Sequence, residues 1–291
     1  MNETPCALFV HAHPDDEASK GSATVAKLVD RGVRCVLVCC TGGEAGEILN
    51  PSVEVAAHPE ILGEVRRAEL EESCAILGFA ALHWLGFRDS GMPDSDANAH
   101  PENFANAPEA EAVGRLVEIL RGERPQVVIG YAEDREFYAH PDHVRVHEIT
   151  RAAFAAAGVS DRFPDRGGPW APSKLYEVGF TRRSLVALAD AHDQAGADNP
   201  FREWLEMWEA SGIPDEDHRY RTRVEVGEYL HKRRASLLAH RTQIDPESFW
   251  MQLTDAQLRA AYPYEDYKLV AWPGAATLEV DEDDLFAGLF G

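Results

Sequence analysis

Short apolar runs, many of them rich in β-branched residues, alternate with longer segments whose apolar residues recur at helical spacing. The runs occupy residues 6–12, 34–40, 82–87, 126–132 and 174–180. The segments between them mostly have a glycine near the end, and they span 22–32, 58–78, 107–122 and 140–158. This alternation predicts an α/β fold, a Rossmann-like and mostly parallel sheet with helices on both faces.

The pattern changes after about residue 181, where we expect helices and turns without clear strands. The acidic cluster at 279–284 is expected to be a solvated cap. The sequence therefore predicts a single domain over 1–291, with a Rossmann-like core at 1–180 and a mainly helical C-terminal elaboration at 181–291.

The composition argues against two classes of partner. The chain has 50 acidic and 28 basic residues, a formal charge of −22, so nucleic acid and anionic membranes would repel it. Its five cysteines form no Cys-x-x-Cys pair, as expected for reduced core thiols. No run approaches the roughly 20 apolar residues of a membrane-spanning helix. We expect a cytoplasmic protein that acts on a small molecule, and a homo-oligomer is compatible with the sequence.

Ionisable residues gather just after two of the predicted strands. "HPDD" at 13–16 follows the first strand, and "HPDH" at 140–143 follows the fourth. Ligands of open α/β sheets bind beyond the carboxyl ends of the strands. Imidazole and carboxylate together suit zinc or another borderline first-row ion. Either segment alone could be a helix cap, but two such segments in equivalent places favour a metal site.

Spacing does not decide which histidines bind the metal. His11 and His13 share one face of a strand, whereas His140, His143 and His147 lie at i, i+3 and i+7 around a helix start. Two histidines and one carboxylate would leave a coordination position open for water, as in catalytic zinc sites. A further carboxylate nearby could take a proton from that water.

"AHPDDE" at 12–17 together with "HPDH" at 140–143 resembles the LmbE-like, or PIG-L, family of zinc-dependent N-deacetylases and amidases, and the likeness runs along the whole chain. Within the family, "TGGEAGEILNP" at 41–51 and "AHRTQIDP" at 239–246 are similar to the amidases that cleave mycothiol S-conjugates, and Lys20 favours this branch. The resemblance implies hydrolysis of a linear amide C–N bond, which releases glucosaminyl-inositol and an N-acetylcysteine S-conjugate. The alternative is deacetylation of N-acetylglucosaminyl-inositol in mycothiol biosynthesis.

The resemblance also implies a metal ligand set and a base. One Zn²⁺ per chain would be held by His13, Asp16 and His143, and Fe²⁺ would fit the same ligands. Asp15 matches the general base of the family.

The histidine that helps to stabilise the oxyanion corresponds to His140, and Asp142 would orient it or pair with its charge. Tyr138 matches a tyrosine that supports the tetrahedral intermediate. In the loop before His140, the family's amidases usually have a Gly-Gly pair, whereas this chain has Glu136 and Phe137 in that region. The bulkier residues restrict the backbone. This difference is consistent with a particular large conjugate, such as a natural-product intermediate, rather than broad detoxification.

The family's sugar- and inositol-binding positions correspond to Glu47, Arg66 and Asp89, and Lys20 is a further substrate-binding candidate. Charged groups suit the recognition of hydroxyls. Three of these residues also have a structural alternative to substrate binding. Arg66 could pair with Glu69 on one helix face, Asp89 could cap a turn, and Lys20 could be a solvated helix charge.

Overall fold

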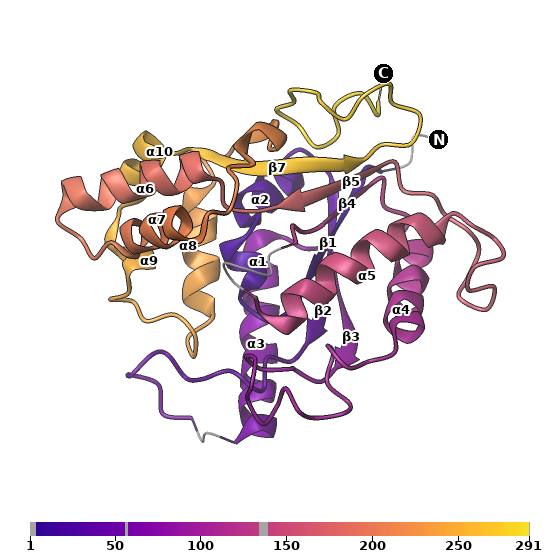
Figure 1. The fold of residues 1–291 in the computed structure, drawn as a ribbon, viewed down its shortest axis with the longest axis horizontal. Helices are drawn as coiled ribbons and strands as arrows, with labels where there is room; N and C mark the ends of the chain where they lie inside the picture. The colour runs from indigo at the N-terminus through magenta and orange to yellow at the C-terminus, as the bar shows by residue number, and fades with distance from the viewer. Residues whose placement is uncertain (1–3, 56–57, 134–138, 291) are drawn as a thin grey trace.

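The computed structural model describes residues 4–55, 58–133 and 139–290, which form a seven-stranded sheet covered by helices (Figure 1). The strand order is β3-β2-β1-β4-β5-β7-β6. The strands that the sequence predicted are parallel: β1 (Cys6–His11), β2 (Arg34–Thr41), β3 (Ala81–Phe87), β4 (Val127–Tyr131) and β5 (Lys174–Val178). They were recognisable because strands buried on both faces are apolar throughout. The predicted α/β class and mostly parallel sheet are confirmed.

Helices cover both faces of the sheet. On one face, α2 (Ser22–Asp30) and α3 (Pro59–Leu77) pack with α8 (Leu230–Ala239). On the other face, α4 (Glu109–Glu123) packs against α5 (Pro141–Ala157) (Figure 1). Strand order reverses at β1, which pairs with β2 on one side and with β4 on the other. This is the point at which open α/β sheets bind their ligands.

The segment after residue 181 contributes strands to the sheet, so the prediction that it has none is wrong. β7 (Tyr264–Ala271) lies antiparallel to β5, and β6 (Thr222–Glu225) lies antiparallel to β7. The sequence hides β7 because Asp266 and Lys268 interrupt its apolar pattern. Both side chains are buried in ion pairs, which makes charged residues compatible with an internal strand.

The rest of this segment is mainly helical, as predicted. α6 packs against α7 and α10, beside the end of β5 (Figure 1). The bounds of the remaining helices are α1 (Asp16–Ser19), α6 (Arg182–Ala195), α7 (Pro200–Ser211), α9 (Phe249–Gln252), α10 (Asp255–Ala261) and the short 3₁₀ helix η1 (Asp217–Arg219).

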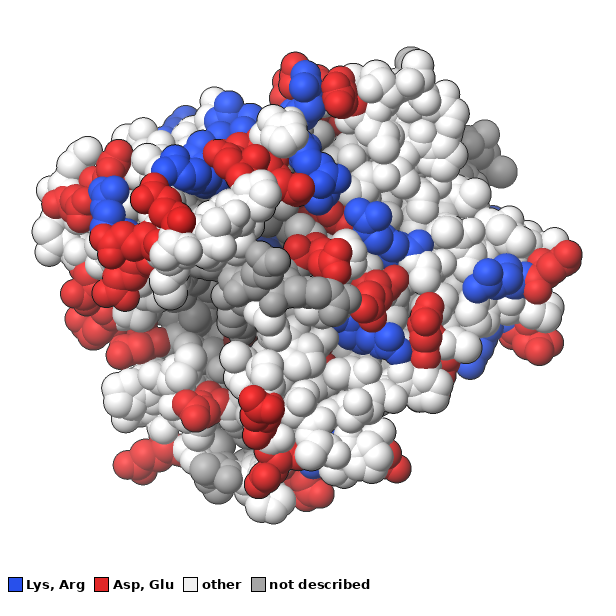
Figure 2. Space-filling view, in the orientation of Figure 1, with Lys and Arg blue, Asp and Glu red and all other residues white. Residues whose placement is uncertain are grey.

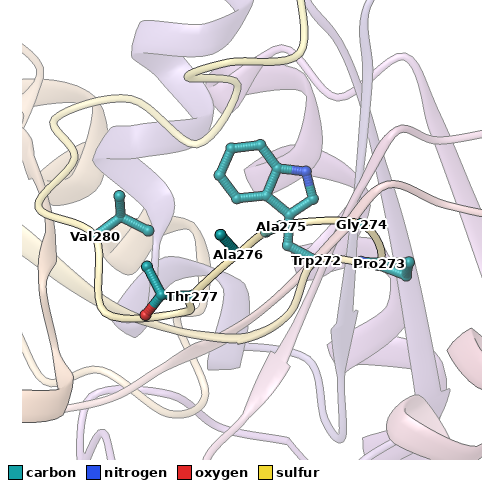
Figure 3. Close-up of a pocket in the computed structure, with 7 residues that line it drawn as sticks. All are labelled: Trp272, Pro273, Gly274, Ala275, Ala276, Thr277 and Val280. Carbon is teal, nitrogen blue, oxygen red and sulfur yellow. The ribbon is translucent and has the colours of Figure 1, made fainter.

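The C-terminal tail is attached to the sheet by a buried ion pair. Glu282 Oε1 lies 2.6 Å from Lys174 Nζ, and both side chains are buried. The acidic cluster is therefore not simply a solvated cap, because one of its members anchors the tail. Between β7 and this anchor, residues 272–280 surround a shallow hollow, into which Figure 3 shows the Trp272 indole projecting.

Acidic side chains gather over the C-terminal helices at the left of Figure 2, and basic side chains are interspersed with them across the upper part of the same face. In the part of the chain that the structure describes, no helix has both the length and the apolar character that crossing a membrane requires.

Candidate metal centre

Three buried side chains with metal-ligand chemistry meet beyond the carboxyl end of β1. His13 and Asp16 follow β1, and His143 lies in the first turn of α5. Their ligand atoms all lie within 4.8 Å of one another. Asp16 Oδ1 is 3.3 Å from His143 Nε2, and Asp16 Oδ2 is 3.4 Å from His13 Nδ1. This donor set of two imidazoles and one carboxylate fits a divalent metal ion with a free coordination position.

A second group of donors shares His13 with the first. It consists of His13, Asp89, His140 and Asp142, and its ligand atoms also lie within 4.8 Å of one another. His13 Nε2 is 3.0 Å from Asp142 Oδ2 and 3.6 Å from Asp89 Oδ1. Although burial opposes ionisation of Asp89, the neighbouring His13 imidazole lowers the pKa of this carboxyl. Three buried carboxylates, those of Asp16, Asp89 and Asp142, thus face His13, and such a group of carboxylates favours a bound cation.

Asp142 contacts both His13 and His140. The Asp142 carboxylate contacts His13. It also accepts two hydrogen bonds from Ser90, one from the hydroxyl and one from the backbone N–H. The backbone N–H of Asp142 instead donates to His140 Nδ1 at 3.2 Å. The sequence did not point to Ser90, although the serine stands in the same "RDSG" segment as Asp89.

His140 is held as a neutral imidazole. Burial and the nearby His13 and His143 rings lower its pKa to about 3. Because Nδ1 accepts the Asp142 N–H, the ring proton is on Nε2. In this state His140 offers its Nε2–H as a neutral hydrogen-bond donor, and its role at the oxyanion stays a prediction.

Asp15 has an unusual backbone conformation beside the ligand set. Its φ of 111° lies in the left-handed region that disfavours non-glycine residues. Arg66 holds this turn, since its Nη2 lies 2.9 Å from Asp15 Oδ2 and donates to the Pro14 carbonyl oxygen. Enclosure of most of the side chain raises the pKa of the Asp15 carboxyl, and the Arg66 guanidinium opposes this rise. A positioned carboxylate with a raised pKa is suited to act as a base.

A buried network behind Asp15 was not predicted. Glu17 Oε2 accepts the Asp15 backbone N–H at 3.0 Å, and Glu17 Oε1 is 2.6 Å from His240 Nε2 and 2.5 Å from Ser73 Oγ. Ser73 Oγ is also 2.6 Å from Ser236 Oγ. Glu17, the last residue of "AHPDDE", could have pointed to this network, because it stands in the motif and yet belongs to no predicted ligand set.

The substrate-binding candidates differ in whether their side chains contact the metal-ligand residues. Lys20 is not a solvated helix charge, since its Nζ lies 2.7 Å from Asp16 Oδ1. Asp89 contacts His13 and also accepts the Gly91 N–H, so it both faces the centre and caps a turn. Glu47 is exposed, and among the described residues its side chain has no hydrogen bond or ion pair.

Arg66 pairs with Asp15 and not with Glu69, which instead accepts hydrogen bonds from Thr242. Tyr138, Glu136 and Phe137 lie outside the described residues.

The family model of PIG-L, described as GlcNAc-PI de-N-acetylase, matches residues 8–154, which include every residue of both motifs. The chain belongs to the PIG-L family. This membership agrees with the resemblance seen in the sequence.

Two relatives of this PIG-L protein match it along nearly its whole length. The mycothiol S-conjugate amidase of Streptomyces coelicolor is 41% identical, covering 97% of this chain and 96% of the relative. The 1D-myo-inositol 2-acetamido-2-deoxy-alpha-D-glucopyranoside deacetylase 1 of Frankia alni is 38% identical, covering 96% of this chain and 99% of the relative. Both sequence-based alternatives are thus represented among the relatives.

A solved structure shares the PIG-L fold. The N,N'-diacetylchitobiose deacetylase from Pyrococcus horikoshii superposes with a TM-score of 0.64 at 19% identity, covering 92% of this chain and 84% of the other. At this identity the similarity supports the fold alone, and the Rossmann-like architecture agrees with the strand order described above.

Proposed function

We propose that the protein is a zinc-dependent amidohydrolase that cleaves mycothiol S-conjugates into glucosaminyl-inositol and an N-acetylcysteine S-conjugate. The observation that carries the proposal is the buried set His13, Asp16 and His143 beside the constrained carboxylate of Asp15. The 41% identity to a mycothiol S-conjugate amidase over 97% of the chain supports this substrate. The deacetylase among the relatives keeps removal of an acetyl group from N-acetylglucosaminyl-inositol as the alternative.

A divalent ion on His13, Asp16 and His143 would polarise the amide carbonyl and lower the pKa of bound water from about 15.7 towards 7. Zn²⁺ suits this donor set, and Fe²⁺ fits the same atoms. The Asp15 carboxylate accepts the proton of the attacking water, and Arg66 holds the carboxylate in place through its 2.9 Å ion pair.

His140 stabilises the charge that develops on the carbonyl oxygen. Its Nε2–H is a neutral donor whose orientation is set by the Asp142 N–H on the opposite nitrogen. Removing one such donor typically costs about a hundredfold to a thousandfold in rate. Tyr138 is assigned a supporting role by the resemblance only. Asp15, once protonated, or His140 delivers the proton to the departing amine.

Different residues around the metal would bind different parts of the substrate. Arg66 and Asp89 are buried near His13, where charged hydrogen-bonding groups can bind sugar and inositol hydroxyls. Lys20 lies beside Asp16, where it would be close to the scissile amide. We further infer that the enzyme acts in the cytoplasm, where small-molecule thiol conjugates are formed.

The test compares two substrates at equal concentrations of zinc-loaded enzyme. A bimane conjugate of mycothiol should release bimane-labelled N-acetylcysteine faster than N-acetylglucosaminyl-inositol releases acetate. The reverse order would favour the deacetylase. Absence of hydrolysis of either substrate by protein with a full complement of zinc would contradict the proposal.

A further inference from the structure

A cavity on the β5 side of the sheet shares one wall residue, Lys20, with the surroundings of the metal centre. Lys20, whose amino group contacts Asp16, forms part of its wall together with Ser19 and Gly21. The opposite wall is built by the end of β5, the start of β7 and the helices α6, α8 and α10. Lys20 is therefore the residue that the centre and the cavity share, and a group that passed it from the metal would enter this space.

The strand order places this cavity opposite the expected sugar site. Asp89 follows β3, and Arg66 lies on α3 and reaches the loop after β2, so both stand on the β2–β3 side of β1. The cavity lies beyond β4, over β5 and β7. An amide held at the end of β1 with its sugar on the first side would therefore have its acyl side directed towards the cavity.

The cavity walls are largely apolar. Val178 and Phe180 come from the end of β5, and further apolar contributions are made by Leu188, Leu230 and Leu258 from three helices. Such walls suit the hydrocarbon part of an S-linked group.

One cation in this wall stands without a bonded partner. Arg233 is half-buried, and its guanidinium forms no hydrogen bond or ion pair with the residues that the structure describes. It lies 5.5 Å from the centre of the Trp250 ring. Burial lowers the pKa of the Arg233 guanidinium, which nevertheless stays charged at neutral pH.

The acidic groups of the cavity are already satisfied. Asp266 Oδ1 pairs with Arg183 at 2.9 Å, and Asp266 Oδ2 accepts the Tyr262 hydroxyl. Glu265 accepts two backbone N–H groups at the start of α2. Glu265 and Asp255 act on Arg233 electrostatically without a hydrogen bond to it in the part of the chain that the structure describes, so its guanidinium N–H groups can still bind an incoming carboxylate.

We propose that this cavity is the acyl-side subsite of the enzyme, and that it selects S-linked groups that are apolar next to the sulfur and end in a carboxylate bound by Arg233. The proposal rests on the proposed function, because the S-linked group is defined by that reaction. Arg233 is accordingly a specificity-determining residue and takes no part in the chemistry.

The test measures binding independently of turnover. Calorimetry on the zinc-loaded full chain compares S-(4-carboxybenzyl)-N-acetylcysteine with S-benzyl-N-acetylcysteine, which differ only in the distal carboxylate. We expect the wild type to bind the carboxylate form roughly tenfold more tightly, as for a hydrogen bond to a charged group. Arg233→Gln should abolish this preference, whereas Arg233→Lys should keep most of it.

Arg259→Gln provides the matched control, because Arg259 is an exposed arginine on α10 outside the cavity wall. Equal binding of the two ligands by the wild type would overturn the proposal, and so would an equal loss of preference in Arg233→Gln and Arg259→Gln. If the binding preference depends on Arg233 but the corresponding mycothiol conjugates are not hydrolysed, the subsite is supported and the proposed function fails.

Discussion

His240 Nε2 lies 2.6 Å from Glu17 Oε1, and both side chains are fully buried. Burial opposes the charge on each group, yet their mutual contact raises the pKa of His240 and lowers the pKa of Glu17. The other Glu17 oxygen accepts the backbone N–H of Asp15, whose φ of 111° is unfavourable for a non-glycine residue. The C-terminal segment thus helps to hold the proposed base in a strained conformation.

This relationship predicts that His240 positions Asp15. His240→Ala leaves the buried Glu17 carboxylate without its imidazole partner, so we expect kcat to fall about tenfold or more with KM little changed. His240→Gln keeps an N–H donor and should recover much of kcat. Steady-state kinetics, with urea unfolding to compare stability, would check this. Equal kcat values in the two variants would show that His240 only packs.

The ligand set predicts a metal dependence. Wild-type protein should bind one zinc per chain, and removing it with a chelator should abolish hydrolysis until zinc is returned. Asp16→Asn and His143→Ala should retain roughly a tenth of the metal or less after dialysis, because each loses a ligand of the set. Elemental analysis measures the metal.

Glu47→Gln is the control for metal content, since the Glu47 side chain is exposed and belongs to neither group of metal-ligand donors. Stoichiometric zinc in both ligand variants would contradict the assignment of His13, Asp16 and His143.

The parallel strands and the meeting of His13 with His143 could be predicted from sequence. Strands buried on both faces form continuous apolar runs, and residues that follow neighbouring parallel strands arrive at the same edge of the sheet. β7 was missed because Asp266 and Lys268 obtain their partners only in the folded chain.

Within the site, the sequence did not predict which residues the side chains contact. Asp142 was expected to orient His140, its neighbour in the motif, or to pair with its charge. Its backbone N–H does contact His140, but its carboxylate contacts His13, which is 129 positions away. The contact of Glu17 with His240 spans 223 positions. Local spacing carries no information about such contacts, which depend on how the helices pack on the sheet.

Asp15→Asn separates the proposed base from the metal ligands. The amide keeps the size of the side chain and should leave bound zinc at one per chain, while kcat falls about a hundredfold to ten-thousandfold because the base is lost. Zinc analysis and turnover should be measured on the same preparation. If the variant keeps most of the wild-type kcat, another group must accept the proton.

The ion pairs of Glu177 predict a pH-dependent contribution to stability. Its buried carboxylate contacts Arg151 at 2.7 Å, His147 at 3.2 Å and Lys268 at 3.0 Å, and so joins α5, β5 and β7. Burial opposes the charge, but these partners lower the pKa of Glu177 to about 2 from the usual 4.5. Because the folded-state pKa is the lower one, this stabilisation is complete above pH 4.5 and is lost as the pH falls towards 2.

Glu177→Gln should therefore lower the free energy of unfolding by about 3 kcal/mol at pH 7. The difference from wild type should stay constant down to about pH 5 and shrink below the usual glutamate pKa. Urea unfolding at a series of pH values measures it. Glu216→Gln is the control, because its carboxylate is half-exposed and 3.7 Å from Lys268, so it should change stability by less than about 1 kcal/mol. A Glu177→Gln effect that is equally small, or that grows as the pH falls, would show that Glu177 is not held ionised by this cluster.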